Sequence, residues 1–491
     1  MNKVSGILVR LITILIFVAC LMPYAAQAQF AEDALRFSTF NVPVGARSAG
    51  MGNTSVGIAA DYSALFTNPG GLALVRSFEF SVGLTNSNFG NDLTFYGITT
   101  KSDNSVTNLN NIGLVYPVPT KRGSLSFAFG FARVANYSST ASFNGFNPYS
   151  SLVEALTPDV NVASMSESER ESFLENNLPF QIFLADTFSG RLYPNVIDSI
   201  QQEGTVREGG GINNWSLGGA IDIAKNISVG VAFNLLSGSY SYDRVYTERD
   251  ARNVYHYAPP FDFDRFRYQS TVNSDLSGFN LLFGLMYRKP GRYNVGFTVK
   301  TPTYYEIEEG FSDVGTAWFD NGDWYEMKKP GSTKYNIRTP VVLSGGLSLQ
   351  LTEWLALAGD AEYTDWTQME FTNDNPDLAD ENWVIRDVMQ ATTNLRGGAE
   401  VSLWDYDLKL RGGVVYNPSP YKGDPKDFDQ LYYTAGIGIA VENNVSLNAS
   451  YAFGKWKTFR DNYYIPGLSA PSRTNESVNR KTLNVTLSYR F

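Results

Sequence analysis

Apolar and polar residues alternate along the last segment of the chain. Between Lys481 and Phe491 every odd-numbered residue from Leu483 is apolar, and the residues between them are polar. The segment Val445 to Phe453 shows the same alternation. A period of two is typical of a β-strand with two unlike faces. The end of the chain is therefore predicted to form strands with one apolar and one polar face.

Segments of this kind recur along most of the chain and predict fourteen strands, an even number. Leu93–Thr100 is a further, shorter candidate for β structure within the first long connection. The fourteen predicted strands are Phe78–Asn86, Asn110–Val118, Gly123–Val134, Ile212–Ala224, Ile227–Tyr242, Val272–Arg288, Arg292–Tyr305, Asn336–Gln350, Glu353–Phe371, Arg386–Leu403, Tyr406–Asn417, Gln430–Glu442, Asn444–Lys457 and Val478–Phe491.

Short and long connections alternate between these strands. A membrane barrel has this pattern because its periplasmic turns are short and its extracellular loops are long. A soluble sandwich has no reason to distribute its loops in this way. We therefore predict an all-β fold, a 14-stranded antiparallel transmembrane β-barrel. The short connections are Pro119–Arg122, Lys225–Asn226, Lys289–Gly291, Leu351–Thr352, Trp404–Asp405 and Asn443.

The two faces of each strand are assigned by the partners that each face can find. Lipid offers no partner to polar groups, so apolar side chains should face outward and polar ones the lumen. The outward set includes Phe127, Phe129, Phe131, Phe283, Leu285 and Tyr287, and the lumen set includes Ser126, Ser228, Asn234 and Asn294.

Three neighbouring strands also carry charged residues at lumen positions. Opposite charges on adjacent strands can pair, and buried charges must largely satisfy one another. A network that holds the lumen wall together is favoured, and a role in substrate passage is the alternative. The residues are Asp360, Glu362, Arg396, Glu400, Lys409 and Arg411.

The chain begins with a secretory signal. Lys3 and Arg10 supply its positive end, an apolar stretch follows, and Ala26 to Ala28 form a small-residue cleavage site. Residues 1–28 are thus predicted to be removed. A lipoprotein acylated at Cys20 is the weaker alternative, because Phe17 stands where such sites usually carry Leu.

The segment from Gly45 to Leu72 has no clean period. It is rich in small residues and ends in an Asn-Pro-Gly-Gly turn, so it predicts compact irregular backbone rather than a strand. We expect residues 29–77 to form a plug (hatch) inside the lumen of the barrel, which comprises residues 78–491. The plug residues singled out are Gly50, Met51, Gly52, Asp61, Asn68, Pro69, Gly70 and Gly71.

The longest extracellular connection is expected at about residues 135–211. Ser166 with Glu169 matches a capping box and predicts a helix there. An apolar cluster follows, which is either a surface that collects hydrophobic molecules or loop packing that caps the barrel. Its candidate contact residues are Phe180, Ile182, Phe183, Leu184 and Phe188.

Composition excludes several kinds of chemistry. The chain has 39 basic and 49 acidic residues, so nucleic acid is not an expected partner. Its single cysteine lies in the signal, and His256 is its single histidine. We therefore expect no catalytic site, no cofactor and no His or Cys metal site. A carboxylate calcium site in Asp374–Glu381 or Asp424–Asp429, and a hydrolase using His256, are less favoured alternatives.

Several motifs resemble the FadL/TodX family of outer-membrane transporters. The run Arg47 to Gly52 and the run Asn68 to Leu72 resemble the family's amino-terminal hatch, although the usual Asn-Pro-Ala is Asn-Pro-Gly here. The strand Asp360 to Trp366 resembles the family's strand ending in Glu-Tyr-Thr-Asp-Trp. Further similar segments are Ala60-Asp61, Leu395–Glu400, Leu410–Gly413, Asn417–Pro420 and the aromatic end Tyr489–Phe491.

This resemblance implies passive outer-membrane uptake of hydrophobic small molecules, either long-chain fatty acids or aromatic hydrocarbons. The solute would pass from the outer loops to the lumen and leave sideways through the wall. The implied partners are outer-membrane lipid, the solute, and the barrel assembly machinery through Phe491, and a monomer is expected. The main alternative is a barrel that acts as a binding or shuttle partner in protein export.

Overall fold

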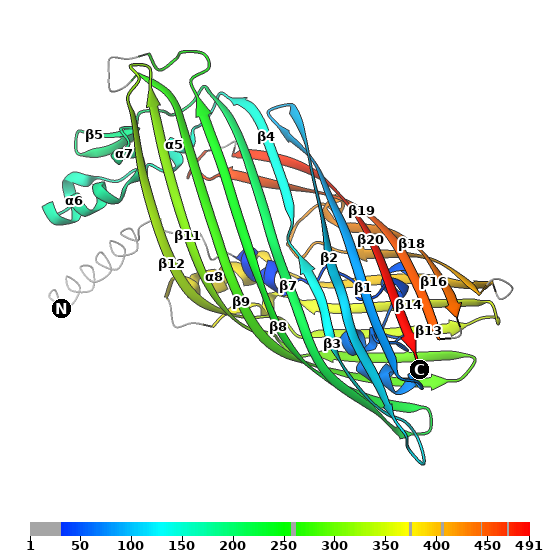
Figure 1. Ribbon diagram of the computed structural model, residues 1–491. Helices are drawn as coiled ribbons and strands as arrows, with labels where there is room; N and C mark the ends of the chain where they lie inside the picture. Colours follow the sequence, from blue (N-terminus) through cyan, green and yellow to red (C-terminus); the bar gives the residue numbers. More distant parts are fainter. Residues whose placement is uncertain (1–30, 257–261, 373–375, 404–406, 443, 469–470) are drawn as a thin grey trace, which may run out of the picture.

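The computed structural model describes residues 31–256, 262–372, 376–403, 407–442, 444–468 and 471–491 (Figure 1). The predicted signal at residues 1–28, with Cys20, lies outside the described residues, as do the predicted turns Trp404–Asp405 and Asn443. No helix among the described residues is long and apolar enough to cross a bilayer.

The wall is a closed antiparallel barrel of 14 strands, which confirms the predicted fold class. The last strand pairs with the first from Glu79↔Arg490 to Thr94↔Asn475, so the sheet has no free edge there. Four wall strands are made of two segments each, and two of these breaks contain Pro302 and Pro340, which lack an N–H for the ladder. In chain order the strands are β1 (Glu79–Phe95), β2 (Ile98–Val118), β3 with β4 (Leu125–Asn136, Ser139–Asn147), β7 (Ile200–Ala224), β8 (Ile227–Arg249), β9 (Phe263–Lys289), β10 with β11 (Tyr293–Lys300, Tyr304–Phe319), β12 with β13 (Trp324–Arg338, Val342–Gln350), β14 with β15 (Leu355–Asp365, Glu370–Phe371), β16 (Ala391–Leu403), β17 (Leu408–Asn417), β18 (Gln430–Glu442), β19 (Val445–Tyr463) and β20 (Ser472–Arg490).

The two faces of the wall are as predicted. Phe127, Phe129 and Phe283 are exposed on the outer surface, whereas Ser126 and Ser228 are buried on the lumen side. Phe131 is half-buried because its ring packs against the outward Trp215, with ring centroids 5.2 Å apart. An apolar outer face and a polar lumen suit a barrel that is surrounded by lipid.

The wall is much taller on one side than on the other. Strands β7, β8 and β9 have 25, 23 and 27 residues, whereas β14 and β17 have 11 and 10. A transmembrane strand needs about 9–11 residues, so the long strands continue well beyond the membrane. The expected extra strand at Leu93–Thr100 is the tip of the β1–β2 hairpin, where Tyr96 and Gly97 take positive φ angles.

Residues 31–74 lie inside the barrel, where Figure 1 shows them as blue coils enclosed by the strands. They form α2 (Ala31–Ser38), α3 (Ala46–Gly50), α4 (Ala64–Thr67) and the 3-10 helix η1 (Pro69–Leu74). Tyr62, Leu65 and Leu72 form one buried apolar cluster with lumen residues of the wall. This segment is the plug of the barrel.

The sequence assignment is wrong at the start of the predicted strand Arg386–Leu403. Arg386 belongs to helix α8 (Pro376–Val388), and β16 begins only at Ala391. Leu378, Ile385 and Met389 recur at helical spacing and are buried in the same cluster as Phe37 of α2. Packing against the plug thus keeps this stretch helical.

Residues 148–199 fold into a lobe at the extracellular end, which projects to the upper left in Figure 1. Residues 135–211, expected as one loop, also include β4 and the first part of β7. The predicted capping box is present, with the Ser166 hydroxyl accepting from the Glu169 N–H at the start of α6. The lobe consists of α5 (Leu152–Ala155), η2 (Val162–Ser164), α6 (Glu167–Asn176), α7 (Leu178–Gln181), β5 (Ala185–Phe188) and β6 (Arg191–Pro194). The 3-10 helices η3 (Trp366–Gln368) and η5 (Lys426–Phe428) lie in later connections.

The barrel predicts that the cost of a lipid-facing charge depends on depth. Val485 lies well inside β20, whereas Val441 lies beside a turn at the end of β18. Both side chains are exposed on the outer face. Val485→Arg should lower the free energy of unfolding by about 2–4 kcal/mol, and Val441→Arg by about 0–1 kcal/mol. Urea unfolding in lipid vesicles measures both, and equal losses would contradict the membrane placement.

Candidate functional site

Plug and wall meet backbone to backbone. Met51 and Gly52 lie against Gly398 of β16 and Gly413 of β17, and Gly50 lies against Gly436 of β18. A Cβ added at Gly398 would be 2.2 Å from the Met51 carbonyl oxygen. Glycine is required at these wall positions because any side chain would occupy the space of the plug backbone.

The Asn-Pro-Gly-Gly turn of the plug is fixed to the wall by hydrogen bonds. The Asn68 side chain is fully buried and donates to the carbonyls of Val56, at 2.9 Å, and Leu285, at 3.1 Å. Its oxygen accepts from the Gly70 N–H, and Ser228 donates to the Gly70 carbonyl at 2.7 Å. Pro69 and Gly71 are also buried, and Gly71 lies directly against Ala59 within the plug. One side chain therefore ties two plug segments to β9.

Five of the six predicted lumen charges form ion pairs, and the sixth makes a different contact. Glu362 binds Arg396 at 2.9 Å, and Glu400 binds Arg411 at 2.7 Å and Lys409 at 3.6 Å. These pairs join adjacent strands, as the network interpretation requires.

Asp360 has another role. Its carboxylate accepts hydrogen bonds from the Ser55 N–H, at 2.5 Å, and the Val56 N–H, at 2.9 Å. Both donors belong to the plug, so Asp360 anchors plug backbone rather than pairing with a lumen cation.

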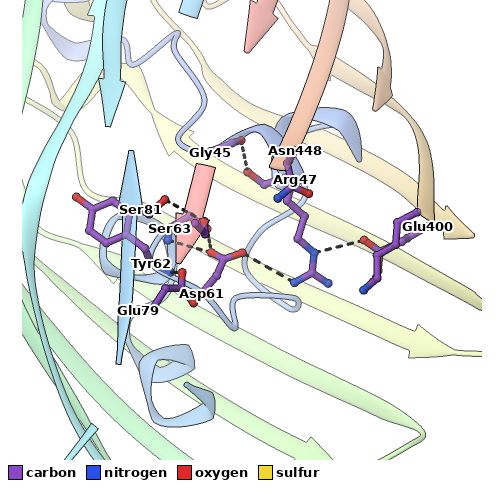
Figure 2. Close-up of polar contacts among 12 residues, drawn as sticks. Gly45, Arg47, Asp61, Tyr62, Ser63, Glu79, Ser81, Glu400 and Asn448 are labelled. Carbon is purple, nitrogen blue, oxygen red and sulfur yellow. Dashed lines mark hydrogen bonds and ion pairs between the residues drawn. The ribbon is translucent and has the colours of Figure 1, made fainter. Parts of the chain in front are cut away.

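Arg47, which was not among the predicted site residues, links the plug to the far wall. Arg47 lies 3.4 Å from Glu400 of β16 and 3.9 Å from Asp61, which is itself in the plug (Figure 2). Next to Asp61, the Tyr62 N–H donates to Glu79 of β1 at 2.9 Å. The hatch motif contained Arg47, but nothing in the sequence showed that its partner is 353 residues away.

Helix α2 fills the upper part of the lumen. Ala31, Ala34 and Phe37 pack among apolar residues of β7, β8, β9 and β11, and α8 covers the helix from the side. Arg36 pairs with Asp33 in the same helix and lies over the Tyr240 ring. Burial raises the pKa of the Glu32 carboxyl and also that of Glu381 in α8. Protein packed around α2 thus occupies part of the lumen at this level.

The wall is split between β2 and the β3–β4 strand. The β2–β3 ladder runs from Val118↔Leu125 and ends at Asn111↔Ala132. A register shift at Arg133 follows, and β4 then pairs with β7. No ladder joins β2 to β4 among the described strands, although the Ser142 N–H donates to the Ser102 hydroxyl near the top at 3.1 Å.

A cavity of about 240 Å³ lies inside the barrel beside this split. Its wall contains aromatic rings and charged groups, which gives it both apolar and polar surface. Lining residues include Phe89, Tyr137, Trp456, Arg36, Glu208 and Arg480.

The five extracellular candidates divide into two groups. Ile182 and Leu184 are fully buried in an apolar core with residues such as Phe143 and Phe266, which caps the barrel. Phe180 is partly buried, whereas Phe183 is 43% and Phe188 73% exposed. Loop packing accounts for the buried residues, and the exposed rings remain available as a contact surface.

Little in the geometry of the described residues supports the alternative metal and hydrolase sites. Within the described residues, no group of three or more His, Cys, Asp or Glu side chains is arranged to hold a metal ion. Residues 376–381 of the first proposed calcium loop are in α8, and Asp424 and Asp429 both accept hydrogen bonds from Ser419. His256 is exposed, with Nδ1 2.9 Å from the Asn253 carbonyl oxygen.

The plug contact predicts a difference between two adjacent glycines of β16. Gly398→Ala places a methyl group inside the Met51 backbone and should destabilise the protein by about 1–3 kcal/mol. Gly397→Ala is the matched control, since a Cβ there meets no atom within 4 Å. Urea unfolding and proteolysis of residues 45–60 measure the effect, and equal behaviour of the two variants would contradict the close contact.

No family model and no curated protein matches this sequence. Solved structures do match in fold. The toluene transporter TodX of P. putida shares 14% identity over 91% of this chain and 99% of its own, with a TM-score of 0.54. A FadL homologue of Pseudomonas aeruginosa shares 12% identity over 92% of this chain and 99% of its own, with a TM-score of 0.57. The monoaromatic hydrocarbon channel CymD shares 13% identity over 92% of this chain and 99% of its own, with a TM-score of 0.51. The 14-stranded barrel of this chain is therefore similar in fold to these transport proteins.

Proposed function

We propose that the protein mediates passive uptake of hydrophobic small molecules across the outer membrane, with exit through the side of the barrel. The proposed solutes are long-chain fatty acids or aromatic hydrocarbons. The observation that carries the proposal is the split between β2 and β3–β4, which lies beside a lumen cavity that plug residues help to line.

The plug supports a lateral route. Its backbone lies against glycines on β16, β17 and β18, and its Asn68 turn is bonded to β9. On this proposal a solute that enters from outside meets the plug along the axis and leaves through the split into lipid, which dissolves apolar molecules readily.

The comparisons support the class of solute. TodX is named a toluene transporter and CymD a monoaromatic hydrocarbon channel. In this chain Phe89, Tyr137 and Trp456 supply apolar cavity surface, and Arg480 supplies a cation that would suit a carboxylate. The two proposed solute types differ in that head group, so oleate and toluene are the probes to compare.

A binding role in protein export is the second candidate. The exposed rings Phe183, Phe188 and Tyr193 on the extracellular lobe favour it, because exposed apolar surface commonly marks a contact with another protein. Mass spectrometry after gentle purification separates the two: a small hydrophobic molecule in the lumen supports uptake, and a tightly held secretion protein supports the binding role.

A disulfide across the split tests the lateral route. Ser102→Cys with Ser142→Cys joins β2 to β4 where the two residues already touch, and the predicted mature chain has no other cysteine. Cells expressing the oxidised double variant should take up labelled oleate or toluene more slowly than after addition of a reductant. Each single-cysteine variant is the control. Uptake that is the same before and after reduction would rule out exit at this split.

A further inference from the structure

The plug crosses the split in the wall with its own residues. The Asn41 and Val42 N–H groups both donate to the Val134 carbonyl of β3, at 3.0 and 3.1 Å. The Asn41 side chain accepts from the Asn136 N–H at 3.1 Å and donates to its carbonyl at 3.3 Å. These bonds satisfy β3 backbone groups at the level where the ladder to β2 has ended.

The same plug segment also holds β2. The Asn110 side chain donates to the Pro43 carbonyl at 2.9 Å and accepts from the Gly45 N–H at 3.1 Å. Residues 41–45 therefore bridge β2 and β3 where these strands no longer bond to each other.

A second contact lies at the last rungs of the ladder. Gly113 of β2 and Gly130 of β3 are paired, and the Tyr62 ring occupies the notch that they leave. A Cβ on Gly113 would be 2.3 Å from the ring, and one on Gly130 would be even closer to the Tyr62 hydroxyl. This notch admits an aromatic ring because neither strand has a side chain there.

The Tyr62 hydroxyl, which has one proton to donate, lies within hydrogen-bond distance of a carbonyl oxygen on each strand. It lies 2.8 Å from the Ile112 carbonyl oxygen and 3.0 Å from the Phe131 carbonyl oxygen. Ile112 and Phe131 are partners in the second-last rung before the split. One buried side chain thus contacts both strands at the point where they separate.

Tyr62 is held from behind by a row of polar contacts that crosses the lumen. Its N–H bonds to Glu79, which also accepts from Arg490 at 2.9 Å. The neighbouring Asp61 lies beside Arg47, whose other partner is Glu400 on the far wall (Figure 2). A movement of α3 away from the wall would therefore pull on the residue that clasps the split.

We propose that Asn41 and Tyr62 form a latch by which the plug keeps the β2–β3 split closed, so that displacement of the plug opens the side of the barrel. This deepens the proposed lateral exit and rests on it for its role in uptake. The latch itself is a property of the wall and can be measured without any solute.

Hydrogen exchange of the protein in lipid nanodiscs tests the latch. Tyr62→Phe keeps the ring in the notch but removes the two hydroxyl contacts, and Asn41→Ala removes the side-chain bonds to Asn136. Loss of one such bond should speed exchange of β2 residues 109–114 and β3 residues 129–136 by about two- to tenfold. Exchange in β16 and β17 should not change.

Tyr305→Phe is the matched control. Tyr305 is a buried lumen tyrosine of β11 whose hydroxyl has no hydrogen-bond partner in the structure. Its loss should leave exchange at the split unchanged. A heat-dependent shift on a denaturing gel shows whether each variant is a folded barrel, and Gly130→Ala, which would expel the Tyr62 ring, gives an independent way to release the clasp.

The outcomes separate the latch from the proposed function. Faster exchange at the split in Tyr62→Phe and Asn41→Ala, with faster oleate or toluene uptake, supports both. Faster exchange with unchanged uptake supports the latch and contradicts lateral exit. Exchange at the split that matches the control in both folded variants overturns the latch, whatever the uptake.

Discussion

The absence of water around the wall is the constraint on which this structure depends. A backbone N–H or C=O that faces lipid has no other partner, so each strand must bond to a neighbour on both sides. The pairing of β1 with β20 meets this requirement by closing the sheet. Above Asn111↔Ala132, strands β2 and β3 no longer hydrogen-bond to each other. There the plug supplies hydrogen bonds through Asn41, Val42 and Gly45.

Close backbone approach is the second physical theme. A plug inside a barrel of this size has to fit against the pleated inner face, and side chains on either surface would keep the two apart. Glycines on β9, β16, β17 and β18 remove that obstacle, and the plug contributes its own small residues opposite them. The close fit of plug and wall therefore depends on small residues in two places, the hatch motif and strands that lie hundreds of residues later in the chain.

Charges in the lumen act mainly as structural ties. Glu400 gathers Arg47, Lys409 and Arg411, and Asp360 binds two plug N–H groups. Buried charges are costly unless paired, so these residues are held in fixed positions. Arg480 differs, because it lines the cavity and no carboxylate lies within ion-pair distance of it among the described residues.

The sequence by itself determined the strands, their two faces and the short turns at 119–122, 225–226, 289–291 and 351–352, because alternation and turn residues are local signals that each strand carries alone. It also indicated a plug, since a glycine-rich stretch without period cannot form a wall strand. The tertiary structure decided where strand became helix at Arg386, how far the strands extend beyond the membrane, and which side chains meet. Tyr62 lies beside Asp61 in the sequence, yet its partners are the carbonyls of Ile112 and Phe131. Contacts of that kind follow from the closure and register of the whole barrel, and no local pattern specifies them.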